Sequence, residues 1–331
     1  MKTVKKYLSL ALILTLALTF LSANSLIQPV YAAGSTGPNG EFIPAGYELA
    51  TDADFHVYPS VDPDDRPYRF HYVGTKPYVV IPHKIQGWEL EGRDYFQMFI
   101  GNKNVRGVAS NNLKITDMSF MFHMCESPSL DLRYLDTSNV VHMDYMFSQC
   151  LATTINLRNI NTSKVEGMRG MFSYSKVKKL NLDHFDCSSL ISADSMFELC
   201  EATSISFKSF NIISADKFVA KLEEREAQIK QSIPYWYPSA AFMFLGTKIT
   251  SIDISDLRID DYDYKGRTVA FTTDGRHPKF SLVGIIFKSN IRTIYVGNEE
   301  VKNLIEAELK DFAEYDYEGH EIPAGLKVVI K

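Results

Sequence analysis

Apolar and polar residues recur along this chain with a period of 25 residues. Each period holds a methionine, a Met-Phe pair three residues later, and an apolar-polar-apolar triplet nine residues after the start of that pair. Several columns that advance in step indicate a structural repeat. The best-preserved columns are Met118, Met143 and Met168; the pairs starting at Met121, Met146, Met171 and Met196; and the triplets starting at Leu130, Ile155, Leu180 and Ile205.

One unit is interpreted as a strand, a turn and a short helix. The triplet Leu130–Leu132 alternates apolar and polar residues, as a half-buried strand does. The segment Asp136–Ser138 has the turn and capping chemistry that starts a helix. Between Val140 and Phe147, apolar residues stand at offsets 0, 3, 6 and 7, which is the spacing of a helical stripe.

A unit of this kind cannot bury its apolar stripe alone, whereas stacked copies form a continuous core. We therefore predict an α/β fold, a solenoid of strand-turn-short-helix units with caps at both ends. The Met-Phe stripe is expected to fill the core rather than to bind a ligand, because it recurs in every unit. The pattern breaks once, after Phe218, and resumes at Met243.

The N-terminus has the pattern of a secretory signal peptide. Three lysines precede an apolar run over 7–21, and Val30-Tyr31-Ala32 has small residues at the positions that a signal peptidase reads. A retained membrane anchor is the alternative, but the run is shorter than the about 20 apolar residues that a spanning helix needs. We therefore expect cleavage after Ala32 and no membrane span in the mature chain.

The repeats and the leader together predict the organisation of the chain. We expect a signal peptide over 1–32, an N-terminal leader segment over 33–67, a cap with a degenerate first repeat over 68–112, regular repeats over 113–218, a helical insertion over 219–240, final repeats over 241–297 with an irregular loop over 256–277, and a C-terminal cap over 298–331.

The repeat unit resembles that of the BspA-like leucine-rich-repeat surface proteins, a form also common in mycoplasma lipoproteins. The resemblance rests on Met118-x-x-Met121-Phe122-x-x-Cys125, the triplet Leu130–Leu132 and Asp136–Val140, and it extends from about Met98 to Val296. It implies an exported bacterial protein with a leucine-rich-repeat-like fold that adheres to host proteins or other cells. This chain lacks the lipobox and the wall-sorting motif of anchored members, so we expect a secreted protein, with attachment to the cell surface left open.

Composition and motifs argue against several other functions. The net charge is −5, and it becomes −8, from 32 basic and 40 acidic residues, without Lys2, Lys5 and Lys6 of the leader. Such a charge argues against nucleic acid as a partner. The eight histidines show no metal-binding spacing, and no nucleophile motif or phosphate loop is present. We predict no enzyme activity, no cofactor and no metal site.

Three cysteines, Cys125, Cys150 and Cys200, occupy one repeat column, in which Ser175 stands in the third unit. Stacking would put Cys125 about one strand spacing from Cys150, so a disulfide between them is one reading. The other reading is a ladder of small buried thiols, which the serine in the same column favours.

The polar face of the strands is the leading candidate for a binding surface, because stacked repeats commonly bind ligands along their strands. An exposed sheet face must in any case be polar, so the two readings weigh evenly. An aromatic cluster in the insertion is the rival site, since aromatic residues are enriched at interfaces. The candidate ligand-binding residues are Asp131, Arg133, Asn156, Arg158, Lys179, Asn181, Asp183 and Lys208 on the strands, and Tyr235, Trp236 and Tyr237 in the insertion.

The sequence thus favours a secreted binding protein that recognises an extracellular protein or glycan through its strand face. Two other classes stay open. One is a structural module of an envelope or matrix assembly. The other is a secreted hydrolase with its site near the loop 256–277. The sequence does not indicate an oligomeric state.

Overall fold

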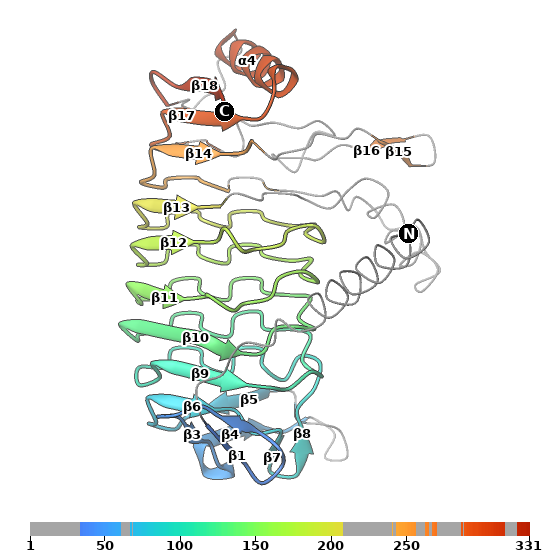
Figure 1. Ribbon diagram of the computed structural model, residues 1–331, viewed down its shortest axis with the longest axis vertical. Helices are drawn as coiled ribbons and strands as arrows, with labels where there is room; N and C mark the ends of the chain where they lie inside the picture. Colours follow the sequence, from blue (N-terminus) through green and yellow to red (C-terminus); the bar gives the residue numbers. More distant parts are fainter. Residues whose placement is uncertain are drawn as a thin grey trace, which may run out of the picture. The chain divides into compact units, whose positions relative to one another are not determined.

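Short strands make up most of the regular structure (Figure 1). The computed structural model describes residues 34–60, 67, 69–207, 240, 243–255, 262–264, 267–269, 286, 288–314 and 323–331. Its elements are β1 (Ser35–Thr36), β2 (Phe42–Ile43), β3 (Glu48–Leu49), a 3₁₀ turn (Asp52–Asp54), β4 (Phe55–Tyr58), β5 (Arg69–Tyr72), β6 (Tyr78–Val80), β7 (Lys84–Ile85), β8 (Trp88–Glu89), β9 (Gly107–Ser110), β10 (Ser129–Leu135), β11 (Thr154–Asn156), β12 (Lys179–Asn181), β13 (Ser204–Ser206), β14 (Ser251–Asp253), β15 (Tyr262–Tyr264), β16 (Arg267–Val269), β17 (Thr293–Val296), α4 (Glu299–Glu314) and β18 (Lys327–Ile330).

The strands fall into several small sheets. The largest has the order β11-β10-β9-β6-β3 and is parallel throughout. Two further parallel groups follow, β12-β13 and β14-β17-β18, while β1-β2, β4-β5, β7-β8 and β15-β16 pair antiparallel. Figure 1 shows β9 to β13 one after another along one side of the repeats.

The 25-residue period of the sequence is also the register of the strand pairs. Leu130 of β10 lies opposite Ile155 of β11, and Leu180 of β12 lies opposite Ile205 of β13. The strands thus form at the apolar-polar-apolar triplets that the sequence predicted. Leu130 and Leu132 are buried, whereas Asp131 between them is half-buried, as the alternation requires.

The predicted short helices are absent, because the amides that would form them bond to the next repeat instead. From residue 69 to residue 207, all described, no segment is helical. Every second amide in the turn segment donates to a carbonyl one repeat further on. The first such set is Met118 to His142, Phe120 to Asp144, Phe122 to Met146 and Met124 to Ser148, each at 2.9 Å between nitrogen and oxygen.

Left-handed residues make this pairing geometrically feasible. Phe120 and Met124 have φ angles of 58° and 55°, and the corresponding residues of the next repeat, Tyr145 and Gln149, have 55° and 56°. An α-helix cannot contain such residues at every fourth position. The prediction of an α/β, leucine-rich-repeat-like solenoid of strand-turn-short-helix units is therefore wrong. The described residues form mostly small sheets joined by turns, and α4 is the one α-helix whose bounds they give.

The Met-Phe columns form the core, as the sequence predicted. The methionines of the columns are at most 1% exposed. Their partner phenylalanines stack face to face in a continuous column, with centroids 5.2–5.7 Å apart and ring planes within 15° of parallel. The stacked rings are Phe99, Phe122, Phe147, Phe172, Phe197 and Phe244.

The Asp/Asn-Thr-Ser segments join consecutive repeats instead of starting helices. The buried Thr137 hydroxyl donates to the carbonyl of Asn161 (3.0 Å) and accepts the amide of the same residue (2.7 Å). Thr162 makes the same two bonds to Asp186, at 3.0 and 2.8 Å. Each threonine thus satisfies both backbone groups of one residue in the next repeat.

The end of the chain departs from the repeat pattern. Helix α4 begins directly after Asn298, whose side-chain oxygen accepts the amide of Val301 at 2.9 Å and so caps the helix. Val301 and Ile305 on this helix are buried. Strand β18 then adds to the parallel sheet of β14 and β17.

Candidate functional site

The outer face of β10 to β13, here called the strand face, has a repeated backbone motif at its polar positions. The side-chain oxygen of Asp131 accepts the amide of Arg133, that of Asn156 accepts the amide of Arg158, and that of Asn181 accepts the amide of Asp183. An Asp or Asn side chain that bonds to the amide two residues on is a local turn motif. These polar side chains therefore have a structural role, because they stabilise the turn that follows each triplet.

Contacts between repeats hold some of these side chains in place. Asn156 donates its amide to the Asp131 carboxylate across one repeat, at 3.0 Å between nitrogen and oxygen. Ser206 on β13 donates to the Asp183 carboxylate at 2.6 Å. Because the strands are parallel and in register, equivalent positions come side by side. The structure thus joins the predicted residues in neighbouring pairs along one face.

Asp131 and Arg133 form an ion pair on this face. The Arg133 Nε atom lies 3.1 and 2.9 Å from the two carboxylate oxygens, and Nη2 lies 2.6 Å from one of them. The carboxylate raises the pKa of the Arg133 guanidinium above its ordinary value. The Arg133 side chain is 48% exposed, so a ligand can reach the pair from solvent.

Arg158, Lys179 and Asn181 extend the same face as exposed side chains. Their neighbour Asp183 is half-buried. The face therefore presents guanidinium, ammonium, amide and carboxylate groups at regular spacing. Such a surface can form hydrogen bonds and ion pairs with a ligand.

The remaining predicted site residues lie outside the described residues. These are Lys208, Tyr235, Trp236 and Tyr237. The predicted signal peptide, most of the insertion 219–240 and most of the loop 256–277 also lie outside them, so the hypothesis of a hydrolase site near that loop stays a prediction.

The sequence interpretation missed a group of three tyrosines beside Arg133. The ring centroids of Tyr47 and Tyr78 are 5.4 Å apart and those of Tyr47 and Tyr134 are 5.5 Å apart, both pairs edge to face. The Arg133 guanidinium lies 5.4 Å from the Tyr134 ring centre. Tyr78 is 41% exposed, and the other two rings are half-buried. These rings enlarge the candidate site at its N-terminal end.

Gly107 makes room for this group. It lies between Tyr78 and Asp131 in the sheet register. A Cβ atom at position 107 would stand 2.5 Å from the Tyr47 hydroxyl and 2.7 Å from the Tyr78 ring. Burial raises the pKa of the Tyr47 hydroxyl above its ordinary value. Tyr47 lies far from the repeats in sequence, so no periodic signal could have placed it here.

The four cysteines are free, buried thiols. The prediction of a thiol ladder is thus confirmed, and the alternative disulfide between Cys125 and Cys150 is absent. The hydrogen bond to Cys125, together with burial, raises the pKa of the Cys150 thiol. Ser175 continues the column with its hydroxyl 3.4 Å from the Cys200 sulfur. The column therefore serves packing.

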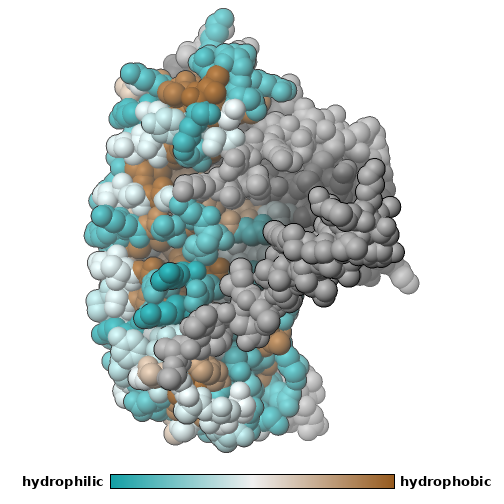
Figure 2. Space-filling view, viewed as in Figure 1, coloured by the Kyte–Doolittle hydropathy of each residue, from teal (hydrophilic) through white to brown (hydrophobic). Residues whose placement is uncertain are grey.

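In the described part of the chain, no three His, Cys, Asp or Glu side chains gather as metal ligands would. None of the helices there combines the length and the apolar character that a bilayer crossing requires. On the face seen in Figure 2, short hydrophobic areas alternate with hydrophilic ones.

Part of the chain matches a known protein family. Residues 93–210 match the model of a family described as "Mycoplasma protein of unknown function, DUF285". No curated protein and no solved structure matches the chain. The matched stretch holds the repeats from Phe99 to Phe197 with their stacked rings. We conclude that this part of the chain is similar to a family of mycoplasma proteins whose function is not known.

Proposed function

We propose that this protein is a secreted, non-enzymatic binding protein that recognises an extracellular protein or glycan through its strand face. Adhesion to a host component or to another cell is the role that this recognition would serve. The main support is the regular, exposed series of polar and charged side chains on in-register parallel strands, with Asp131 and Arg133 at one end. The three tyrosines beside Arg133 add aromatic surface of the kind that interfaces favour.

The similarity of residues 93–210 to the mycoplasma family concerns the repeats and does not bear on secretion or binding, because the function of that family is not known. The finer assignment, to the BspA-like leucine-rich-repeat surface proteins, is part of the proposal and rests on the repeat motif. Export is also part of the proposal, and it rests on the leader sequence. The mature chain is accordingly proposed to begin at Ala33.

The test is capture of ligands by the mature chain from extracellular matrix and bacterial surface fractions. The double variant Arg133→Glu/Arg158→Glu reverses two charges on the strand face. The control Lys164→Glu/Lys248→Glu makes the same change of net charge at exposed lysines away from the strand positions. We expect the first variant to lose bound components that the wild type and the control retain. An unchanged profile would contradict a role for the strand face.

A further inference from the structure

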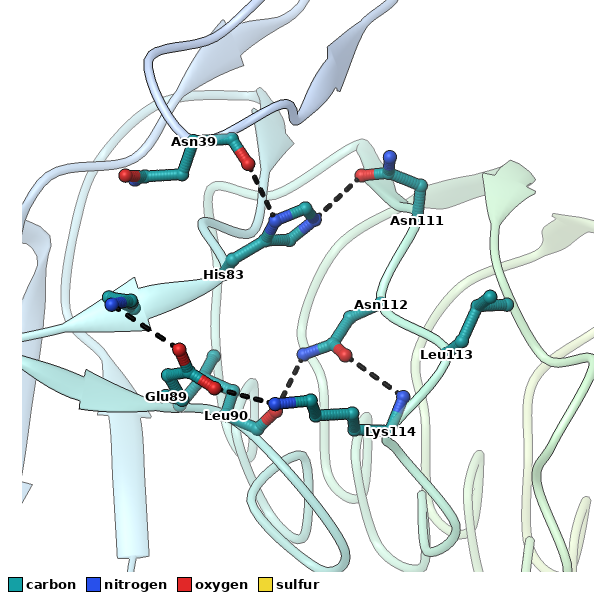
Figure 3. A pocket seen from close by; sticks show the side chains of 9 residues that line it. Asn39, His83, Glu89, Leu90, Asn111, Asn112, Leu113 and Lys114 are labelled. Carbon is teal, nitrogen blue, oxygen red and sulfur yellow. Dashed lines mark hydrogen bonds and ion pairs between the residues drawn. The ribbon is translucent and has the colours of Figure 1, made fainter.

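An open hollow lies beside the β7-β8 hairpin, away from the strand face. Its volume is about 340 Å³, at the lower end of the range of small-ligand pockets. Three segments distant in sequence supply its walls: the β1-β2 turn, the β7-β8 hairpin with its flanks, and the residues after β9 (Figure 3). The lining residues are Asn39, His83, Lys84, Glu89, Leu90, Asn111, Asn112, Leu113 and Lys114.

His83 and Asn111 form one wall and are held rigidly. The ring Nδ1 atom of His83 lies 3.1 Å from the backbone oxygen of Asn39, and Nε2 lies 3.0 Å from the Asn111 side-chain oxygen. The Asn111 amide has its orientation set by the backbone, because its oxygen faces the amide of Phe42 (3.4 Å) and its nitrogen donates to the carbonyl of Gly40 (3.3 Å).

A buried carboxylate fixes the turn above this wall. The Glu41 side chain accepts the backbone amide of Asn39 (3.0 Å), the Asn39 side-chain amide (3.1 Å) and the backbone amide of His83 (3.1 Å). Burial alone would raise the pKa of Glu41, but these hydrogen bonds lower it overall, so the carboxylate stays charged. The wall is therefore preorganised without a ligand.

Glu89, flanked by two lysines, forms the opposite wall. Lys84 and Lys114 place their ammonium groups 3.3 and 2.5 Å from the two carboxylate oxygens. The hydrogen bond from Lys114 and then that from Lys84 lower the pKa of Glu89. Asn112 completes the wall, with its nitrogen donating to the carbonyl of Leu90 at 2.7 Å. Each ammonium has three donors, so both lysines keep donors beyond the ion pair.

The chemistry of the walls selects among ligand classes. The Glu89 wall offers a carboxylate acceptor beside two ammonium donors, which matches hydroxyl groups because each hydroxyl donates and accepts. The central carboxylate offsets one lysine charge, which disfavours a simple anion. None of the nine lining residues is Phe, Tyr or Trp, which disfavours a nucleobase, and Leu113, 63% exposed, is the one well-exposed apolar side chain among them, which disfavours a lipid.

The geometry points to a saccharide-binding site in this hollow, where one sugar unit lies between the His83–Asn111 wall and the Lys84–Glu89–Lys114 wall and places its C–H face on Leu113. The sugar would accept hydrogen bonds from the lysines and donate one to Glu89. This site is separate from the strand face and does not depend on the function proposed for that face.

The test measures binding of methyl glycosides of glucose, galactose, mannose and N-acetylglucosamine to the mature chain by ligand-observed NMR. Each sugar is used at about 10 mM, which detects a Kd of about 1 mM. Glu89→Gln removes the charged acceptor and both ion pairs. We expect at least one sugar to bind the wild type and to bind this variant about tenfold more weakly, because a charge-assisted hydrogen bond contributes at least that factor.

The repeats offer a matched control. Glu201 also holds two lysines, Lys176 at 2.5 Å and Lys178 at 2.6 Å, but lies outside the hollow. Glu201→Gln should therefore bind the sugar as the wild type does, and so should Arg133→Glu/Arg158→Glu, whatever becomes of its ligand capture. A second hollow variant, Leu113→Glu at an exposed position, should weaken binding while the fold is retained.

Three results would overturn the assignment. The first is that no sugar of the panel binds the wild type. The second is that Leu113→Glu and a folded Glu89→Gln both bind as well as Glu201→Gln does. The third is that inorganic phosphate at the same concentration binds in a manner that depends on Lys84 and Lys114, while no sugar binds.

Discussion

The repeats from Met118 to Phe207 and the N-terminal region over 34–112 use polar side chains in different ways. In the repeats, a polar side chain bonds to the equivalent part of the next unit, as Thr137 does with Asn161 and Thr162 with Asp186. In the N-terminal region, polar side chains connect segments without any period. Asn111 meets Phe42 across 69 positions, and Glu41 meets His83 across 42.

The two regions therefore offer different kinds of surface. The repeat contacts are local between neighbours, and exposed polar side chains of the repeats lie on the strand face. The irregular contacts of the N-terminal region leave a hollow with fixed polar walls. The first region explains the fold, and the second contains the hollow in which we propose a saccharide site.

The largest expected effect is in the stacked ring column. Phe147 is fully buried between Phe122 and Phe172, with centroids 5.6 and 5.3 Å away. Phe147→Ala should lower the free energy of unfolding by about 3–5 kcal/mol, because it leaves a cavity between two repeats. Denaturant unfolding measures this change. The control Leu113→Ala, at an exposed position of the N-terminal region, should cost less than about 0.5 kcal/mol, and a similar loss in both variants would contradict the account.

The next largest loss of stability is expected in the N-terminal region, on substitution of Asp54. The size of this loss should depend on pH. The Asp54 carboxylate is 13% exposed and accepts hydrogen bonds from Lys76 (2.5 Å) and from the amide and hydroxyl of Thr51 (2.8 and 3.0 Å). Burial would raise its pKa, but these bonds outweigh burial and lower it. Asp54→Asn should cost about 1.5–3 kcal/mol at pH 7, the usual range for a bond to a charged group.

The sign of this pH dependence follows from the lowered pKa. The stabilisation by Asp54 is fully present above its unfolded pKa of about 3.9 and is lost as pH falls through the lower folded value. The gap between wild type and Asp54→Asn should therefore close in acid. Asp144 in the repeats is the opposite case, because burial raises its pKa. Asp144→Asn should cost less at pH 7 than Asp54→Asn, and the reverse order would refute this comparison.

Much of the repeat core could be predicted from sequence because its residues recur. Met118 and Phe122 have buried equivalents one repeat later, at the predicted positions, and the equivalent of Leu130, Ile155, is partly buried against the same core. The helix prediction failed because an apolar stripe with offsets 0, 3, 6 and 7 also fits a turn segment that pairs with the next repeat. One sequence signal of this was missed. Gly101, Gly170 and Gly246, all with positive φ, stand in the two left-handed columns.

The candidate site was predicted in part, for the same physical reason. Asp131 was found because it is the polar residue of a periodic triplet, and Arg133 because it follows that triplet directly. Tyr47 and His83 were not, since their partners Tyr134 and Asn39 are distant in sequence and no period relates them. Contacts of this kind are visible only once the chain is folded.

A smaller effect is expected from the threonines that join the repeats. Thr162 is 1% exposed and satisfies both backbone groups of Asp186. Thr162→Val keeps the shape but leaves those groups without the hydroxyl, so we expect a loss of about 1–2 kcal/mol. The exposed Thr154, changed to Val, is the control in thermal unfolding. An equal loss at both positions would contradict the role of the buried hydroxyl.

The smallest expected effect comes from backbone strain. Met124 is 49% exposed and has a φ angle of 55°, a conformation that glycine adopts more readily. Met124→Gly should leave stability unchanged or raise it by up to about 1 kcal/mol. Gly170→Ala is the opposite change in the neighbouring left-handed column, where a Cβ would lie 2.4 Å from the Tyr145 ring. Gly170→Ala should therefore lower the free energy of unfolding. An equal decrease on Met124→Gly would argue against backbone strain at Met124.

The central structural claim is that each 25-residue unit is one interchangeable layer that is held by its neighbours in register. Denaturant unfolding of a chain that lacks residues 143–167, compared with a chain that lacks 143–166, tests it most directly. Removal of one whole period lets Phe122 stack on Phe172 and His142 pair with Ser192 as neighbours do now, so we predict a single cooperative transition. Removal of 24 residues shifts every column and should abolish that transition. Two chains that unfold alike would contradict the account.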